Sequence, residues 1–160
     1  LENYGFRGTF FCVGNNVHKY PETFQAIIER GHGVGSHCFH HENGWKTGFQ
    51  DYLDSVHHGA NVIGNKLFRP PHGKLTYRQY KRLKNEFQLV MWSVLSGDYD
   101  QHEKPENLLR HCLEFTSPGD IVVMHDSEKA WENLKYILPE FLKHCKQKGW
   151  QVIALPKSSR

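Results

Sequence analysis

The sequence predicts an α/β fold in which parallel strands form a sheet, open or closed into a barrel, with helices on the outside. Short apolar runs alternate with amphipathic helical stretches along the chain, and the connections between them are short. The chain has 160 residues, enough for one compact domain with its own apolar core. We therefore expect one domain over residues 1–156 and a tail over residues 157–160.

The elements of the first half follow from local patterns. Residues 8–13 (GTFFCV) are an apolar run typical of a buried strand. Pro21 suits the first turn of a helix, and Gly31 ends that helix. The later elements expected here are a strand at 32–36, a long polar loop at 38–48, a helix at 49–63, a strand at 67–68, a rigid turn at 69–73, and a helix capped by Thr76 that runs to about Phe87.

The second half repeats this alternation. Residues 88–94 (QLVMWSV) and 120–124 (DIVVM) are β-rich apolar runs, which predict two more strands. Apolar side chains at helical spacing predict helices at 105–115 and at 131–148, and Gly149 ends the second of these. Residues 151–155 are expected to form a last strand.

Composition excludes several classes of protein. The net charge of +3 is too small to indicate a nucleic acid or an anionic membrane as the partner, and 38% hydrophobic residues exclude disorder. No apolar run approaches the roughly 20 residues that cross a bilayer. The four cysteines have no metal-type or disulfide-type spacing, so we expect them to be reduced and mostly buried, which favours a reducing compartment: Cys12, Cys38, Cys112 and Cys145.

Candidate chemical groups follow the ends of four predicted strands. Ligands and catalytic groups of parallel α/β proteins gather at the carboxyl ends of the strands, so this placement indicates a functional site. In chain order the groups are His37 with His40 and His41, Arg69, Asp98, and His125 with Asp126.

His37 and His41 lie four residues apart, a spacing that can direct two imidazoles to one metal ion. His40 could replace His41 if the turn differs, and a histidine-rich surface loop is the alternative interpretation. Six other histidines have no partners in sequence, and we expect them on the surface or hydrogen-bonded in the core: His18, His57, His58, His102, His111 and His144.

The turn at Arg69–Gly73 (RPPHG) is held by two prolines, and Gly73 permits close approach of the backbone. Such a turn can direct the N–H of His72 toward a developing oxyanion while Arg69 orients a carboxylate. The alternative is a stiff turn with a solvent-exposed Arg69.

His125 follows an apolar strand and is a candidate general acid tuned by a carboxylate such as Asp98; a core histidine bonded to a carbonyl is the alternative. Three aromatic residues could stack on sugar rings, although the position of Trp92 inside a strand favours the core: Trp45, Trp92 and Tyr99.

These stretches resemble, in order, the motifs of the polysaccharide deacetylases of the NodB-homology type (carbohydrate esterase family 4). The resemblance covers nearly the whole chain. Gly8–Gly14 resembles a barrel strand, and Gly31–His41 resembles the H-x-x-x-H motif, with Cys38 in place of Ser or Thr. Arg69–Gly73 resembles the R-P-P-Y-G motif, with His72 in place of Tyr. Trp92–Tyr99 resembles the motif that ends in Asp-Trp, with Tyr99 in place of Trp and Leu95 where an Asp is common, and Val123–His125 resembles the L-x-H motif.

The resemblance implies a distorted (β/α) barrel and metal-dependent removal of acetyl groups from the N-acetylated sugars of a glycan such as a chitin oligomer or peptidoglycan. A divalent metal, usually zinc, would be held by His37, His41 and an aspartate, and a second aspartate would activate the metal-bound water. The resemblance also implies that Arg69 orients that base and that Pro71 and the His72 N–H bind the oxyanion. It implies that His125, tuned by Asp98, is the general acid. Val123 would form a wall of the acetyl pocket, and Tyr99 would contact the substrate.

The family's first motif, T-F-D-D-G, supplies both aspartates, and no Asp-Asp pair occurs in the 160 residues. We expect this motif upstream of Leu1, on a first strand and helix of the barrel that the chain lacks. Two other hypotheses remain: a carbohydrate-binding pseudo-enzyme of the same fold, and a structural zinc protein. A binding module has little need of Arg69, Asp98 and His125 together, which favours the enzyme.

Overall fold

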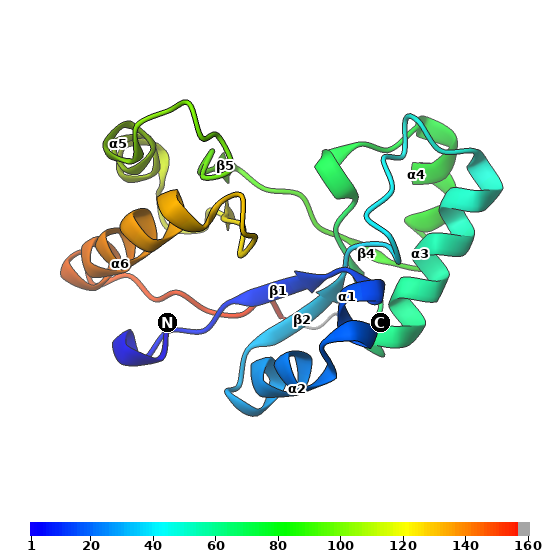
Figure 1. Ribbon diagram of the computed structural model, residues 1–160, viewed down its shortest axis with the longest axis horizontal. Coiled ribbons are helices and arrows are strands. Elements are labelled where there is room, and N and C mark those ends of the chain that lie inside the picture. The colour runs from blue at the N-terminus through cyan, green and yellow to red at the C-terminus, as the bar shows by residue number, and fades with distance from the viewer. Residues whose placement is uncertain (157–160) are drawn as a thin grey trace. The chain divides into compact units, whose positions relative to one another are not determined.

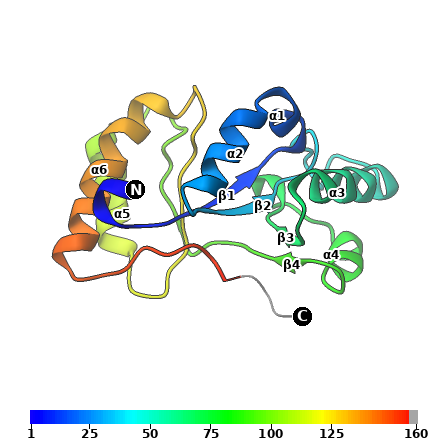
Figure 2. The same cartoon turned by 90° about the horizontal axis from the view of Figure 1, so that it is seen from below.

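The larger sheet of the computed structural model, which describes residues 1–156, has four short parallel strands in the order β1-β2-β3-β4 (Figure 1 and Figure 2). They are β1 (Thr9–Cys12), β2 (Gly33–Ser36), β3 (Leu67–Phe68) and β4 (Gln88–Leu89). Phe11 pairs with Gly35, Ser36 with Phe68, and Leu67 with Gln88. Because all four strands run the same way, the segments that follow them lie at one edge of the sheet. Two further strands, β5 (Val94–Leu95) and β6 (Val122–Val123), form a separate parallel pair.

The described chain divides into two compact units. The sheet unit comprises residues 7–91 and 153–156 and contains β1 to β4. The helical unit comprises residues 1–6 and 92–152 and contains β5 and β6. Each unit is described by itself below. The expected tail at residues 157–160 lies outside the described residues.

In the sheet unit, α1 (Gly14–Lys19) and α2 (Pro21–Glu29) follow β1 in the chain (Figure 2). Helices α2 and α3 (Phe49–Ile63) pack on β2, and α1 packs on α3. A single 3-10 turn at Pro71–Gly73 and helix α4 (Tyr77–Leu83) connect β3 to β4. Helix α4 begins at a complete capping box. The Thr76 hydroxyl accepts from the Gln79 N–H, and the Gln79 side chain accepts from the Thr76 N–H.

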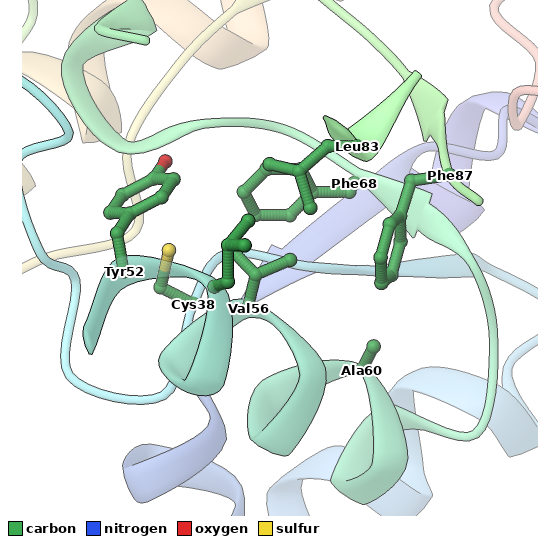
Figure 3. Packing of buried hydrophobic residues seen from close by; sticks show 8 residues of the cluster. Cys38, Tyr52, Val56, Ala60, Phe68, Leu83 and Phe87 are labelled. Atoms are coloured by element: carbon green, nitrogen blue, oxygen red, sulfur yellow. The ribbon is translucent and has the colours of Figure 1, made fainter. Parts of the chain in front are cut away.

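The core of this unit lies between α3, β3 and α4 (Figure 3). Phe68, the last residue of β3, is fully buried, and so are Tyr52 and Val56 on α3 and Leu83 on α4. The pattern that predicts this helix is the apolar spacing of Leu53, Val56, Ala60 and Ile63, which are buried as well. The core therefore holds the strand whose end carries Arg69.

The helical unit packs α5 (Pro105–Phe115) against α6 (Trp131–Gln147), with a short 3-10 turn at Glu2–Tyr4 beside α6. Cys112 of α5 and Ile137 of α6 are fully buried together with Phe6, which is 1% exposed. This core supports β5 and β6, whose ends carry Asp98 and His125. No helix in the described residues is long and apolar enough to cross a membrane.

The predicted α/β class with parallel strands is confirmed. The helices at 49–63 and 105–115 and the strand at 67–68 have the predicted bounds. Helix α1 was not predicted, because its residues carry no apolar stripe. It is anchored instead by N–H groups of Gly14 and Asn15, which donate to the carbonyls of Cys38 and Phe39.

Two predicted elements are wrong in extent, and a third does not form. The strand at 88–94 is divided into β4 and β5, because the carbonyls of Val90 and Met91 accept from the Arg69 guanidinium instead of from a neighbouring strand. The helix expected to reach Phe87 ends at Leu83, and the Phe87 N–H turns back to the Leu83 carbonyl.

The expected strand at 151–155 does not form. Its contact with β1 is made through a side chain, since the Leu155 N–H donates to the Thr9 hydroxyl at 2.8 Å, and Ile153 is 71% exposed. A side-chain acceptor cannot continue a backbone ladder, so the segment stays extended without pairing.

Gly59 fixes how closely α3 approaches the segment after β2. A Cβ atom at this position would lie 2.7 Å from the Cys38 carbonyl carbon and 2.9 Å from the Ser36 hydroxyl. Neither neighbour can easily move, because one is backbone and the other is fully buried. The contact therefore requires glycine.

We predict that Gly59→Ala lowers the free energy of unfolding by about 1–3 kcal/mol in urea titrations, because overpacking outweighs the ~1 kcal/mol that alanine adds to an ordinary helix position. The exposed Asn61→Ala on the same helix is the control and is expected to be neutral or slightly stabilising. A stabilised Gly59→Ala variant would contradict the close approach of α3 to Cys38.

Candidate functional site

His37 follows β2 directly and is held by the segment after β3. Its backbone N–H donates to the Cys12 carbonyl at 3.0 Å, which continues the β1–β2 ladder. Its ring Nδ1 lies 2.7 Å from the Arg69 carbonyl oxygen. A carbonyl only accepts, so Nδ1 carries the proton and the lone pair is on Nε2. This is the tautomer and the outer-shell bond that a metal-ligating imidazole uses.

The rings of three histidines lie in succession next to this bond. The centroids of the His37 and His41 rings are 4.8 Å apart, and those of His41 and His72 are 4.7 Å apart. His37 is half-buried, whereas His41 and His72 are exposed. The alternative of His40 in place of His41 is not what the fold adopts, because the His40 ring packs against Phe39 at 4.6 Å.

The backbone of this region is strained. Cys38, His41 and His72 have φ angles of 62°, 64° and 58°, and they are the non-glycine residues with positive φ among residues 1–156. The left-handed conformation costs roughly 1–2 kcal/mol per residue, and such costs concentrate at functional sites. Two of these residues, His41 and His72, are the ones whose rings meet edge to face.

The residues present supply part of a metal's ligand set. No group of three or more His, Cys, Asp or Glu side chains within the described part of the chain is arranged to hold a metal ion. His37 and His41 offer two imidazoles, which suit a borderline-soft divalent ion such as zinc. Cys38 is not a candidate ligand, since its side chain is fully buried in the same core cluster as Tyr52 and Val56.

The imidazole of His72 is a feature that the sequence analysis missed, because that analysis assigned a role only to its backbone N–H. Burial and the positive charges of Lys74 and Lys46 lower the pKa of His72, so its neutral form is favoured. The backbone N–H of His72 donates to no acceptor within residues 1–156, whereas the backbone N–H groups of Gly73 and Lys74 donate to the carbonyls of Pro70 and Pro71. The substitution of His for the motif's Tyr is the signal that could have drawn attention to the ring.

Arg69 is buried, at 8% exposure, so the alternative of a stiff turn with a solvent-exposed arginine is wrong. Its guanidinium donates to the carbonyls of Val90 and Met91 at 3.4 and 3.2 Å and lies 4.1 Å over the ring of Phe11. Burial lowers the pKa of Arg69 to about 10, which leaves it charged at neutral pH. Pro71 beside it is also buried.

The helical unit contains a second constellation, the pair of Asp98 and His125. The Asp98 carboxylate is fully buried and accepts from the backbone N–H of His125 at 2.6 Å and from its Nδ1 at 2.7 Å. These bonds place the Nδ1 proton toward the carboxylate and leave Nε2 as the nitrogen that exchanges a proton. The His125 side chain is 40% exposed, so it can meet solute.

Two neighbours complete this pair. Asn133, in the first turn of α6, donates to the backbone carbonyls of Asp98 and Asp100 at 3.0 and 2.9 Å and fixes the loop between them. Asn133, which is buried, was not among the predicted site residues. Its place in the first turn of a predicted helix is the signal in the sequence that could have pointed to it. The Tyr99 ring meets the His125 ring edge-on at 5.2 Å.

The predicted site residues therefore fall into two groups, one in each unit. His37, His41, Arg69, Pro71 and His72 lie in the sheet unit, and Asp98, Tyr99, Val123 and His125 lie in the helical unit. Val123 is buried on β6, two residues before His125. Of the aromatic candidates, Trp92 is half-buried and follows β4 in the chain, and Trp45 is 65% exposed.

The comparison with known proteins shows the family of the chain. The model of the family "Polysaccharide deacetylase" matches residues 1–90, more than half of the chain. The chain belongs to this family.

One relative is the peptidoglycan-N-acetylmuramic acid deacetylase PdaA of Bacillus subtilis strain 168, which is 31% identical over 137 residues, or 78% of this chain and 51% of PdaA. The chain spans between 51 and 78% of the length of this and three other curated relatives.

Solved structures show the same fold at lower identity. The peptidoglycan deacetylase PdaC of Bacillus subtilis superposes with a TM-score of 0.84 at 22% identity over 97% of this chain and 77% of that chain. BA3943 of Bacillus anthracis, described as a pseudoenzyme of carbohydrate esterase family 4, superposes with a TM-score of 0.81 at 23% identity over 97% of this chain and 56% of that chain. The expected barrel type is confirmed.

We predict that the His125 ring is the Nδ1–H tautomer at neutral pH and that Asp98→Asn destroys this preference, because the side-chain amide no longer supplies a full negative charge to the Nδ1 proton. Long-range proton–nitrogen NMR correlations of the histidine rings measure this. His111, whose ring packs on Phe115 of the same unit, is the internal control and should not change. An Nε2–H tautomer in the unmutated chain would contradict the pairing.

We also predict that iodoacetamide at pH 8 labels Cys12 before the other cysteines. Burial raises the pKa of Cys38 to about 12, that of Cys112 to about 11, and that of Cys145 above its ordinary value, so their reactive thiolates are scarce until the pH approaches those values. Cys12 is only half-buried. Peptide mass spectrometry locates the label, and early labelling of Cys38 would contradict its burial.

Proposed function

We propose that this protein removes acetyl groups from the N-acetylated sugars of a peptidoglycan-like glycan. The observation that carries this proposal is the Asp98–His125 pair, because a buried carboxylate on Nδ1 and an exposed Nε2 are what a general acid requires. The His37 tautomer is the second support, since its Nε2 lone pair suits a metal ion. The relatives' activities on peptidoglycan sugars favour this substrate class.

The reaction is the hydrolysis of an amide. Water adds to the acetyl carbonyl carbon, the C–N bond breaks, and the products are acetate and the free amine of the sugar. The leaving nitrogen needs a proton, which His125 supplies from Nε2 while Asp98 stabilises the imidazolium through Nδ1. The fully buried carboxylate keeps the ring in one orientation during this transfer.

A divalent metal, zinc in our proposal, would be held by His37 and His41 with an aspartate, and when bound it polarises the acetyl carbonyl and lowers the pKa of water. The outer-shell bond from His37 to the Arg69 carbonyl holds the first imidazole in place. Second-shell bonds of this kind change metal affinity about 10- to 100-fold when they are removed.

The remaining residues position the substrate. The His72 N–H, beside Pro71, is available to a developing oxyanion because no acceptor in residues 1–156 uses it. Arg69 brings a buried positive charge that would orient the carboxylate of the base. Val123 would wall the acetyl pocket, and Tyr99, in edge contact with His125, would meet the sugar.

A binding protein that has lost the chemistry is the second candidate. It is favoured by the absence of any Asp-Asp pair from the 160 residues and by the fold's occurrence in BA3943, a protein described as a pseudoenzyme. Such a protein would still bind glycan, so acetate release separates the two candidates.

The test uses the chain together with any residues its gene encodes before Leu1, loaded with zinc, on N-acetylglucosamine oligomers and on peptidoglycan. We expect acetate release that falls roughly 100-fold or more in His125→Ala, because a general acid contributes about 10²–10⁴ to the rate. His37→Ala should lose both activity and tightly bound zinc, and a chelator should reproduce that loss.

His111→Ala is the matched control, since this histidine lies on α5 of the same unit as His125 and contacts Phe115 instead. Its activity should equal that of the unmutated protein. Glycan binding without acetate release from the zinc-loaded protein would overturn the hydrolase and leave the binding protein.

A further inference from the structure

Trp45 is exposed but firmly held. Its side chain is 65% exposed, in the loop that follows His41. The indole Nε1–H donates to the Leu75 carbonyl at 3.1 Å, and the backbone N–H donates to the Asn43 side chain at 3.0 Å. A large apolar ring that is held in one orientation in solvent is a surface on which a ligand can stack.

A buried side chain supports the loop that carries Trp45. Gln79, which is 1% exposed, donates from Nε2 to the Gly44 carbonyl at 3.0 Å while its Oε1 accepts from the Thr76 N–H at 2.8 Å. A Cβ at Gly44 would lie 2.3 Å from the Lys74 carbonyl oxygen, so the loop and the segment after the Arg69–Gly73 turn are in close contact. The position of Trp45 is therefore determined by the fold of the sheet unit alone.

Positive charge surrounds this ring. The Lys74 ammonium lies 4.9 Å over the indole, and Lys46 follows Trp45 in the chain. Lys74 lies two residues after His72 in the chain, and the His72 ring lies 4.7 Å from the His41 ring, so this charge is near the His41–His72 ring pair. The acid on this loop, Glu42, is turned to the His40 N–H at 3.1 Å. The same pairing continues along α4, where Lys81 lies 5.0 Å over the ring of Tyr77, which is 71% exposed.

A flat apolar face beside ammonium groups matches a particular ligand chemistry. The indole presents a surface on which the apolar face of a pyranose ring can stack, as other planar and semi-planar ligands stack on aromatic platforms. Ammonium groups attract a carboxylate and raise the local concentration of an anionic polymer. A neutral glycan would use the ring and have no use for the lysines.

We propose that Trp45, Lys46 and Lys74 form a subsite for a carboxylate-bearing sugar of the glycan strand, near the rings of His41 and His72. This proposal rests on the proposed function and narrows it to an anionic, muramic-acid-type glycan. The indole stacks on the sugar ring, and the two lysines bind the carboxylate of that sugar. The sugar in this subsite is a different one from the sugar that carries the reacting acetyl group.

The test measures binding, which does not depend on acetate release. Titration calorimetry compares a glycan fragment containing N-acetylmuramic acid with a neutral N-acetylglucosamine oligomer of the same length, at low and high salt. We expect tighter binding of the anionic fragment at low salt and loss of that advantage at high salt, because exposed charges are screened. Lys46→Gln and Lys74→Gln should each weaken the anionic fragment about threefold and leave the neutral oligomer unchanged.

Trp45→Ala should weaken both fragments about tenfold, since stacking does not depend on the carboxylate. Lys66→Gln is the matched control: this exposed lysine precedes β3, at the opposite edge of the sheet from Arg69–Gly73, and should change nothing. Equal affinity for the two fragments at low salt, or an effect of Lys66→Gln as large as that of Lys74→Gln, would overturn the subsite. A protein that binds with this pattern but releases no acetate keeps the subsite and fails the proposed hydrolysis.

Discussion

The short segment around Arg69 links three strand ends of the sheet unit. The backbone N–H of Arg69 donates to the Ser36 carbonyl and extends the pairing of β2 with β3. Its carbonyl accepts from His37 Nδ1, and its guanidinium donates to the carbonyls of Val90 and Met91 after β4. A single residue therefore orients the first imidazole, ends β4 and carries a buried charge. Its burial depends on Phe68, which holds the preceding position in the core.

The two candidate constellations are built by one physical device. In each, a histidine at the end of a parallel strand donates from Nδ1 to an oxygen that the fold has fixed, a backbone carbonyl for His37 and a buried carboxylate for His125. The acceptors differ in charge, and this difference separates their chemistry. A neutral carbonyl leaves the ring as a neutral ligand, whereas a carboxylate stabilises the imidazolium that a proton donor passes through.

The cost of the arrangement is concentrated in the sheet unit. Cys38, His41 and His72 adopt left-handed backbone conformations, and Gly59 gives up a side chain so that α3 can reach the Cys38 carbonyl. The capping box of α4 and the buried Gln79 hold the neighbouring loop against this strain. Stability from the core is thereby used to keep exposed rings, those of His41, His72 and Trp45, in fixed orientations.

Local pattern was sufficient where a segment's own side chains decide its structure. The stripe of Leu53, Val56, Ala60 and Ile63 predicts α3 because helix periodicity is a property of neighbouring residues. It failed at residues 88–94, which divide into β4 and β5, and at residues 151–155, which form no strand, because the partner groups are the Arg69 guanidinium and the Thr9 hydroxyl, remote in sequence. The roles of Asn133 and of the His72 ring were missed for the same reason, since each depends on contacts across the fold.

The sequence by itself determined the α/β class, the order of the motifs and the family, because these depend on residue type and spacing along the chain. It also named His37, His41, Arg69, Asp98 and His125 as the candidate groups. Only the tertiary structure decided that His41 rather than His40 lies beside His37, that Arg69 is buried, and which nitrogen of each paired imidazole carries the proton. Those properties depend on backbone dihedral angles and on hydrogen-bond acceptors that folding brings from other strands, which spacing along the chain does not encode.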